Sequence, residues 1–219
     1  GNPFGGTDFF YYPWYKEMFG DANFWQAWID RYHLLRQGPL SSAAMAARID
    51  ELSAQLDPGG ADAPAVRTVT RWSVSAPRTS ASNTPITKDL FDGSYAGEVA
   101  WLKHFWQQRQ EFIESQFTRP AVANLAPGKV PAGSSVTLSS PSQGLGGVKI
   151  YYTTDGKDPR APGGQVAPGA IEYTGPIPIK GPTRLHARAF DPTPPSDPAL
   201  GKVPVGSGWS APTVIVYSL

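Results

Sequence analysis

Apolar residues in the first part of the chain recur at the spacing of amphipathic helices. Positions i, i+3 or i+4, and i+7 are apolar over three segments, which predicts helices at residues 24–37, 41–56 and 94–117. Ser41 or Ser42 can cap the second helix, and the run from Asp57 to Gly60 ends it. The stripes predict a shared helical core that contains Ile49, Leu52, Trp106 and Ile113.

The connection between the second and third helices is long and polar. Residues 64–91 are rich in Ser, Thr, Pro and Ala, and connections of this length are unusual in compact domains. The pattern leaves open whether residues 60–92 are ordered.

The second part of the chain carries short alternating segments separated by proline and glycine. They predict six or seven strands, near residues 121–124, 135–139, 148–153, 170–173, 177–179, 183–190 and 213–217. In residues 183–190, apolar side chains alternate with polar ones, so one face is expected to be apolar and the other solvated. The apolar residues are Leu185, Ala187 and Ala189, and the polar ones are Arg184, His186 and Arg188. The predicted sandwich core consists of Val136, Leu138, Ile150, Tyr152, Leu185, Ala187 and Val214.

Proline and tryptophan divide the chain into two parts. Residues 119–219 hold 16 of the 23 prolines, whereas residues 1–118 hold six of the seven tryptophans. Because Pro120 stops a helix, the boundary is placed at residues 117–120. The fold class predicted is α + β multidomain: a three-helix all-α domain, residues 1–118, followed by an immunoglobulin-like antiparallel β-sandwich, residues 119–219.

Bulk composition excludes several classes of function. The net charge is +1 and no basic run is present, so no nucleic-acid partner is expected. The chain has no cysteine, which rules out disulfides and thiolate metal sites. No apolar run approaches the length of about 20 residues that a membrane span requires. The chain begins at Gly1 without an initiator Met, and we expect it to be a piece of a longer protein.

No catalytic constellation emerges from the sequence. Asp30, Asp50 and Glu51 are potential acids, but they are expected on the solvated faces of helices, pairing with Arg31, Arg48 or Arg71. The histidines, His33, His104 and His186, show no metal-ligand spacing and are expected to be structural or superficial. We therefore predict no catalytic residue, no cofactor and no metal.

Four residues of the second part are candidate ligand contacts, each with a structural alternative. Asp155 and Asp158 could hold a calcium ion, although Asp side chains in turns usually bind their own loop amides. Tyr151 could stack on a sugar, or it could pack across strands. Trp209, in Gly208-Trp209-Ser210, could form an exposed sugar platform or close the end of the sandwich.

The second part resembles a known accessory module. The ordered set Lys149-Ile-Tyr-Tyr-Thr-Thr-Asp-Gly-Lys-Asp-Pro-Arg160, Tyr173-Thr-Gly-Pro-Ile-Pro-Ile179, Thr183-Arg-Leu-His-Ala-Arg-Ala-Phe190 and Gly208-Trp-Ser210 is similar to the C-terminal β-sandwich of chitobiases and β-hexosaminidases. Modules of this kind are also attached to many secreted bacterial proteins. The resemblance implies a non-catalytic accessory module, extracellular or on the cell surface of a bacterium.

The helical part has a second resemblance. Phe24-Trp-Gln-Ala-Trp-Ile-Asp-Arg-Tyr32, Ala47-Arg-Ile-Asp-Glu-Leu52, Arg71-Trp72 and Glu98-Val-Ala-Trp-Leu-Lys103 resemble the C-terminal end of spore-coat H-type (CotH-like) atypical protein kinases. The match covers residues 14–117. That family's nucleotide- and metal-binding motifs lie upstream of this region, so the resemblance transfers no functional residue to this chain.

Together these features predict a fragment that is not itself an enzyme. The sandwich is expected to act as a spacer or as a weak glycan- or protein-binding module, next to upstream domains of the same parent chain. The alternative is that the helices form part of the C-lobe of a CotH-like kinase and help to position its protein substrate.

Overall fold

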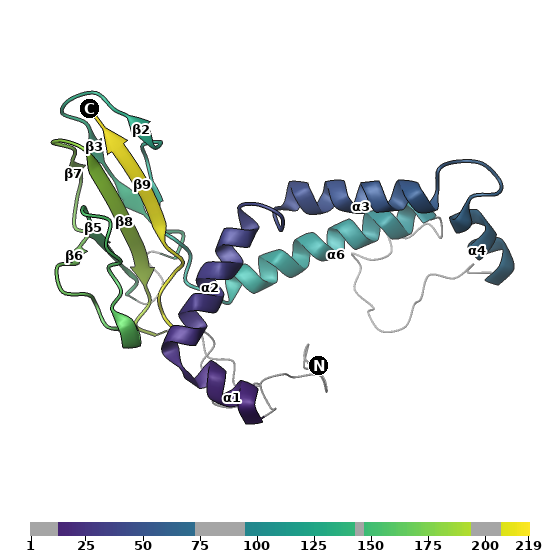
Figure 1. The fold of residues 1–219 in the computed structure, drawn as a ribbon, viewed down its shortest axis with the longest axis horizontal. Coiled ribbons are helices and arrows are strands. Elements are labelled where there is room, and N and C mark those ends of the chain that lie inside the picture. Colours follow the sequence, from purple (N-terminus) through teal and green to yellow (C-terminus); the bar gives the residue numbers. More distant parts are fainter. Residues whose placement is uncertain (1–12, 73–94, 143–146, 194–206) are drawn as a thin grey trace. The chain divides into compact units, whose positions relative to one another are not determined.

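The computed structural model describes residues 13–72, 95–142, 147–193 and 207–219 (Figure 1). These residues form five α-helices and several small sheets, an α + β fold with a sandwich-like module. The helices are α1 (Pro13–Gly20), α2 (Ala22–Arg36), α3 (Ser42–Leu56), α4 (Pro64–Trp72) and α6 (Tyr95–Ser115).

Three of these helices match the predicted ones, and two were not predicted. The hydroxyl of Ser41 accepts a hydrogen bond from the Ala44 amide at 3.2 Å and caps α3 as expected. Helix α4 begins at Pro64, because proline is favoured at a first helical position, where its missing N–H costs nothing. In the segment 60–92, residues 64–72 are therefore helical, and residues 73–92 lie outside the described residues. A three-helix domain is not confirmed.

The strands build a five-stranded sheet of order β2-β9-β8-β5-β6 and two small sheets, β1-β4 and β3-β7. All their pairings are antiparallel except that of β2 with β9, which is parallel. The strands are β1 (Val122–Ala123), β2 (Gly128–Lys129), β3 (Ser135–Val136), β4 (Leu138–Ser139), β5 (Lys149–Thr153), β6 (Ile171–Glu172), β7 (Ile177–Pro178), β8 (Thr183–Phe190) and β9 (Thr213–Ser218), with a 3-10 turn, η2 (Pro162–Gly164).

The sandwich core lies between the five-stranded sheet and the two small ones. Strand β8 is central, and its Leu185, Ala187 and Ala189 are fully buried in register with β5 and β9. Most predicted core residues belong to this cluster, but Val214 does not, since 45% of its surface is exposed. Residues 214–217 are all apolar, so the sequence could not fix which of them point inward. The inward residues of β9 are Ile215 and Tyr217.

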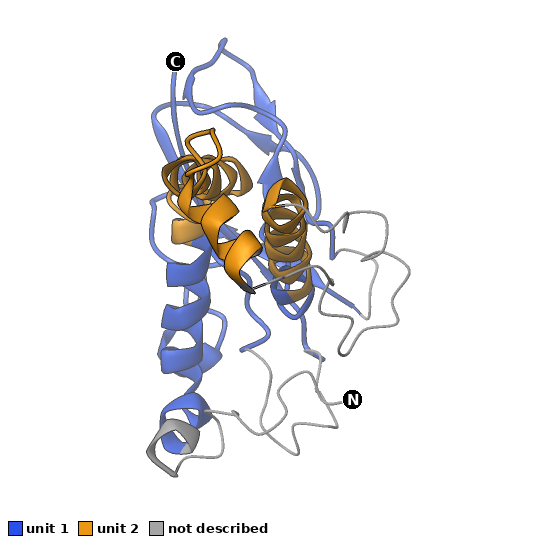
Figure 2. Cartoon of the chain, turned by 90° about the vertical axis from the view of Figure 1, so that its right-hand side faces the viewer, with its two compact units in different colours: residues 1–33, 113–219 blue, residues 34–112 orange. Residues whose placement is uncertain are grey.

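The chain divides into two compact units, drawn in different colours in Figure 2. The first unit comprises residues 1–33 and 113–219, and the second comprises residues 34–112. The first unit has a second apolar cluster besides the sandwich core, which is formed by Phe19, Trp25, Ile29, Phe117 and Ala211 with Phe24, Tyr32 and Ile113 at its edge. The predicted domain limits at 118 and 119 remain a prediction.

The single helical core predicted for Ile49, Leu52, Trp106 and Ile113 is wrong. Ile113 packs in the second cluster of the first unit, and Leu52 in α3 is 43% exposed. Ile49 and Trp106 are half-buried in the second unit. Helical periodicity identified the apolar stripes but not the elements that cover them. In the described part of the chain, no helix has the length and apolar character needed to cross a membrane.

Candidate functional site

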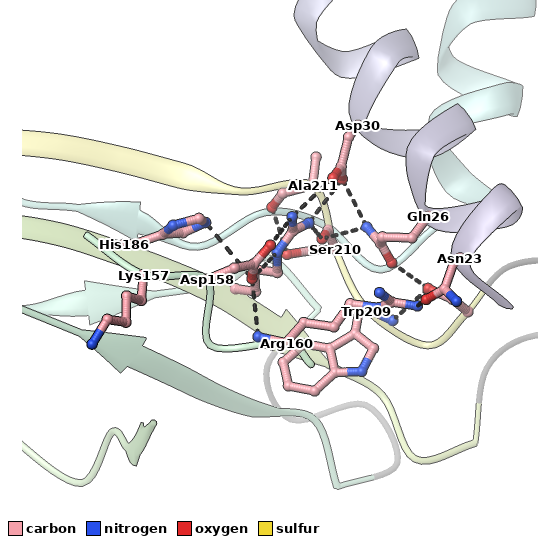
Figure 3. A network of polar contacts seen from close by, with 12 residues as sticks. Asn23, Gln26, Asp30, Lys157, Asp158, Arg160, His186, Trp209, Ser210 and Ala211 are labelled. Carbon is pink, nitrogen blue, oxygen red and sulfur yellow. Dashed lines mark hydrogen bonds and ion pairs between the residues drawn. The ribbon is translucent and has the colours of Figure 1, made fainter. Parts of the chain in front are cut away.

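The most organised group of polar side chains surrounds Arg188 on β8. Figure 3 labels its partners Asp30, Asp158 and Ser210. Arg188 is only 3% exposed, and all five N–H groups of its guanidinium have an acceptor. The Nε and Nη2 atoms donate to the two carboxylate oxygens of Asp158 at 2.8 and 2.6 Å. Nη1 and Nη2 donate to Asp30 at 2.8 Å each, and Nη1 also donates to the Ser210 carbonyl at 2.8 Å. A buried cation is thus bound by two carboxylates in bidentate geometry.

Helix α2 supplies one side of this network. Asn23, Gln26 and Asp30 follow one another at i, i+3 and i+7, so they lie along one stripe of the helix. The side-chain nitrogen of Gln26, Nε2, donates to Asp30 at 2.7 Å and to the Ser210 carbonyl at 3.1 Å. The side-chain oxygen of Gln26 accepts a hydrogen bond from the hydroxyl of Ser207. This stripe connects the helix to the segment that precedes β9.

The first residue of the stripe, Asn23, binds the turn that follows β5. Its side-chain oxygen accepts hydrogen bonds from the Gly163 amide at 2.8 Å and from Arg160 Nη2 at 3.1 Å. Arg160 Nη2 also donates to the carbonyl of Ala22 at 2.9 Å. The start of α2 therefore satisfies polar groups of the sandwich that no strand partner reaches.

The loop after β5 supplies the other carboxylate, and its shape follows from local turn chemistry. Asp155 Oδ1 accepts from the Lys157 amide at 3.0 Å, and Asp158 Oδ1 accepts from the Arg160 amide at 2.9 Å. Between them Gly156 adopts a φ of 83°, a left-handed conformation that favours glycine. These two Asx turns fold the loop back over β8 and point Asp158 at Arg188.

The solvated face predicted for β8 is therefore wrong for two of its three polar residues. His186 is 9% exposed and Arg188 is 3% exposed, whereas Arg184 remains exposed. The loop 155–160 and helix α2 bring the partners of these two side chains. Asp30 also departs from expectation, since it pairs with Arg188 across 158 positions of sequence instead of with a neighbouring arginine.

Charges within the network stabilise one another. Burial alone would lower the pKa of Arg188, but hydrogen bonds from its guanidinium to Asp30 and Asp158 outweigh burial and raise it. Burial likewise pushes the pKa of Asp158 upward, and the hydrogen bonds from Arg188 and the Arg160 amide hold it below its usual range. Burial, followed by the nearby charge of Arg188, lowers the pKa of Arg160. The cluster is therefore an ion-paired structural centre.

His186 lies beside the same pair. Its Nδ1 is 3.3 Å from the Gly156 carbonyl, and its Nε2 is 3.8 Å from Asp158 Oδ1, without a hydrogen-bond partner among the described residues. Burial lowers the pKa of this imidazole, and the carboxylate of Asp158 only partly opposes that effect. The neutral ring is thereby favoured in the folded protein.

The two aromatic candidates predicted from the sequence pack against each other. Trp209 is 1% exposed, and its indole Nε1 donates to the Gly164 carbonyl at 2.7 Å. Its ring lies 4.7 Å from that of Phe190 and 5.7 Å from that of Tyr151, measured between centroids. Tyr151 is half-buried. Trp209 thus closes the end of the sandwich, which is the structural alternative considered for it.

The residue before Trp209, Gly208, occupies a backbone position that leaves no room for a side chain. Gly208 has a φ of 76°, and a Cβ at this position would lie 2.5 Å from the carbonyl oxygen of Asp191. The carbonyl of Gly208 accepts hydrogen bonds from the Asp191 amide and the Thr118 hydroxyl. A side chain would therefore break the approach that positions Trp209.

The acidic candidates are occupied by protein partners. Both oxygens of Asp158 face Arg188, and Asp155 pairs with Lys157 at 3.0 Å. Over the ranges the structure describes, no three His, Asp or Glu side chains gather in a way that could hold a metal ion. Asp50 pairs with Lys103 and Glu51 pairs with Arg48, in exposed ion pairs of the second unit. The arrangement around Asp158 favours the turn interpretation over a calcium site.

Sequence reasoning missed the residues that organise the site, namely Asn23, Gln26, Asp30, Arg160 and Arg188. Two signals could have found them. Arg188 stands between Ala187 and Ala189 in a strand whose core residues are small, and an arginine in such a position needs fixed partners. The spacing of Asn23, Gln26 and Asp30 marks a polar stripe on a helix that is otherwise rich in aromatic residues.

Comparison with known proteins supports the sandwich and leaves the helices unassigned. Residues 125–199, about a third of the chain, match the family model of the chitobiase/beta-hexosaminidase C-terminal domain. No curated protein and no solved structure matches the chain. These comparisons give no support to a CotH-like kinase portion, which stays a prediction. The matched region contains Asp158, Arg160 and Arg188, whereas their partner Asp30 lies outside it.

Proposed function

We propose that this chain is a non-catalytic accessory part of a larger secreted or surface bacterial protein, and that its sandwich acts as a spacer. The observation that carries the proposal is the burial of Trp209, whose ring packs on Phe190 and Tyr151 and whose N–H is bound to a backbone carbonyl. A sugar site needs an exposed ring with fixed polar groups that converge on it. Trp209 offers neither its ring nor its N–H to a ligand.

The match of residues 125–199 to a C-terminal domain of chitobiases and β-hexosaminidases is consistent with this role. It leaves weak glycan binding as the competing function, with Tyr151 as the one partly exposed ring among the predicted contacts. Such binding is expected to be no tighter than about 1 mM, which corresponds to about −4 kcal/mol, because one half-buried ring without convergent polar groups makes a weak site.

A titration with chitin oligosaccharides distinguishes a spacer from a binding module. Backbone amide shifts of the whole chain are followed by NMR as the hexamer of N-acetylglucosamine is added. The spacer proposal expects no saturating shifts below about 1 mM. Saturation below about 1 mM that is lost in Tyr151→Ser, but kept in Val216→Ser on the same sheet, would overturn it. A broad glycan array repeats the test for other sugars.

A further inference from the structure

We infer that the end of the sandwich around Arg188 is a docking site for a helix that presents one carboxylate to it, that α2 of the same chain occupies it through Asp30, and that helix and sandwich consequently move as one body. This inference goes beyond the spacer role, since it names the partner surface and predicts a mechanical property. It concerns only residues of the first unit.

Charge is the first property of the sandwich end that favours α2. Without α2, the sandwich end would present Arg160 and Arg188 with Asp158 as their shared carboxylate partner. The guanidinium of Arg188 would then keep three of its five N–H bonds to groups of the sandwich, and the two that bind Asp30 would be left without their acceptor. Asp30 completes both the hydrogen bonds and the charge balance. A site built in this way selects a helix that carries a carboxylate at this point.

Shape is the second property. Asn23, Gln26 and Asp30 cover about two helical turns, and each binds a different part of the sandwich. Their partners are the η2 turn, the carbonyl of Ser210 before β9, and Arg188 on β8. Polar groups fixed at three such points determine the register and the rotation of the helix, which a purely apolar contact would leave adjustable.

The third property is the apolar contact beside this stripe. Trp25 and Ile29 of α2 are almost fully buried, in one cluster with Phe117 and with Ala211, which immediately follows Ser210. The polar stripe and the apolar cluster thus border the same segment, residues 210–211. The apolar cluster supplies affinity and the polar stripe supplies specificity, so we expect one fixed arrangement instead of a flexible tether.

Spin-label distance measurements on the whole chain test the inference. Because the chain has no cysteine, Ala27→Cys on α2 and Val216→Cys on β9, both exposed, give a single label pair. We expect a narrow, unimodal distance distribution. Adding Asp30→Lys places a cation against Arg188 and should broaden the distribution. Asp50→Lys, in an exposed ion pair of α3, is the matched control and should leave it narrow.

A second label pair keeps the test decisive if a variant is poorly folded. Val216→Cys with Ile171→Cys lies wholly within the sandwich and should stay narrow in every variant. Broadening of both pairs in Asp30→Lys calls for the milder Asp30→Asn, which must broaden the helix pair alone. A broad distribution in the parent chain would overturn the inference. So would a helix pair that stays narrow in both Asp30 variants.

Discussion

The two compact units of this chain are stabilised by different means. The first unit buries large side chains completely, including Trp209, Tyr217, Ile29, Ile150 and Leu185. In the second unit, α3 has no buried residue, and the buried apolar side chains among the described residues are Ala63 and Ala65. Because apolar burial is the dominant favourable term in folding, the first unit is expected to be the more stable of the two.

The ion pairs of Arg188 in the first unit are also more buried than the pair of Lys103 and Asp50 in the second unit. Arg188 is enclosed, and its partners Asp30 and Asp158 are about one-third exposed. The pair of Lys103 and Asp50 in the second unit lies at the surface, where such pairs contribute about 0–1 kcal/mol. Ion pairs between the same types of charged group can therefore contribute unequally to stability, and the burial of the charged groups accounts for the difference.

The largest expected effect is the loss of a buried tryptophan. Trp209→Ala should lower the free energy of unfolding of the first unit by about 3–5 kcal/mol, since it leaves a cavity against Phe190 and Tyr151. Trp106→Ala in the second unit should cost about 1–2 kcal/mol, because a half-buried ring loses less apolar contact area.

Urea unfolding followed by methyl NMR signals separates the two units, with Leu185 reporting on the first and Ile49 on the second. Separate probes are needed because two compact units need not unfold together. Equal losses for the two tryptophan variants would show that the contrast in burial does not govern stability.

The next largest effect concerns the buried cation. Arg188→Met should cost about 1.5–3 kcal/mol in the first unit, because it leaves two partly buried carboxylates without their partner. The matched variant Lys103→Met should change the stability of the second unit by about 0–1 kcal/mol. The same two methyl probes measure both. An Arg188→Met variant as stable as the parent would mean that apolar packing alone holds α2.

Local pattern was sufficient for some elements. The pattern predicts β8 with the bounds Thr183–Phe190 that the structure shows, and it predicts the cap of α3 at Ser41 or Ser42, of which the structure has Ser41, because alternation and capping depend on adjacent residues. Helix α4 does not stand out in the sequence, because its first residue, Pro64, lies in a connection rich in Ser, Thr and Pro, although proline at a first helical position favours a helix.

The site could not be predicted because its partners are distant in sequence. Alternation in β8 separates two faces, but it does not tell what covers each face. Asp30 reaches Arg188 across 158 positions, and Asp158 reaches it across 30. Without the fold, Asp30 is one of several helix charges, and solvation is the ordinary state of such charges. Trp209 differs from Asp30, since burial is the common state of a large aromatic side chain and the sequence therefore allows both an exposed platform and a buried plug.

The smallest expected effect is on how the stability of the first unit depends on pH. Burial holds the pKa of His186 below its usual value of about 6.5. Below that pH the unfolded chain therefore binds more protons at this residue than the folded chain does. The free energy of unfolding of the first unit should fall as the pH decreases from about 6.5 toward the folded pKa of His186.

Asp158 contributes in a lower pH range, because its folded pKa is also lowered. It stabilises the fold above about pH 3.9, and this contribution is lost only as the pH falls through its folded pKa.

The two groups can be separated because their pH windows differ. His186→Gln should flatten the decline of first-unit stability between about pH 7 and about pH 5, and it should leave the decline below about pH 4 in place. The change of stability with pH is compared, since the substitution itself alters the absolute value. His104→Gln in the second unit is the matched control and should leave the slope reported by Leu185 unchanged. If the decline of stability between about pH 7 and about pH 5 persisted in His186→Gln, another group would cause it. The neutral imidazole of His186 would then not account for the acid sensitivity of the first unit.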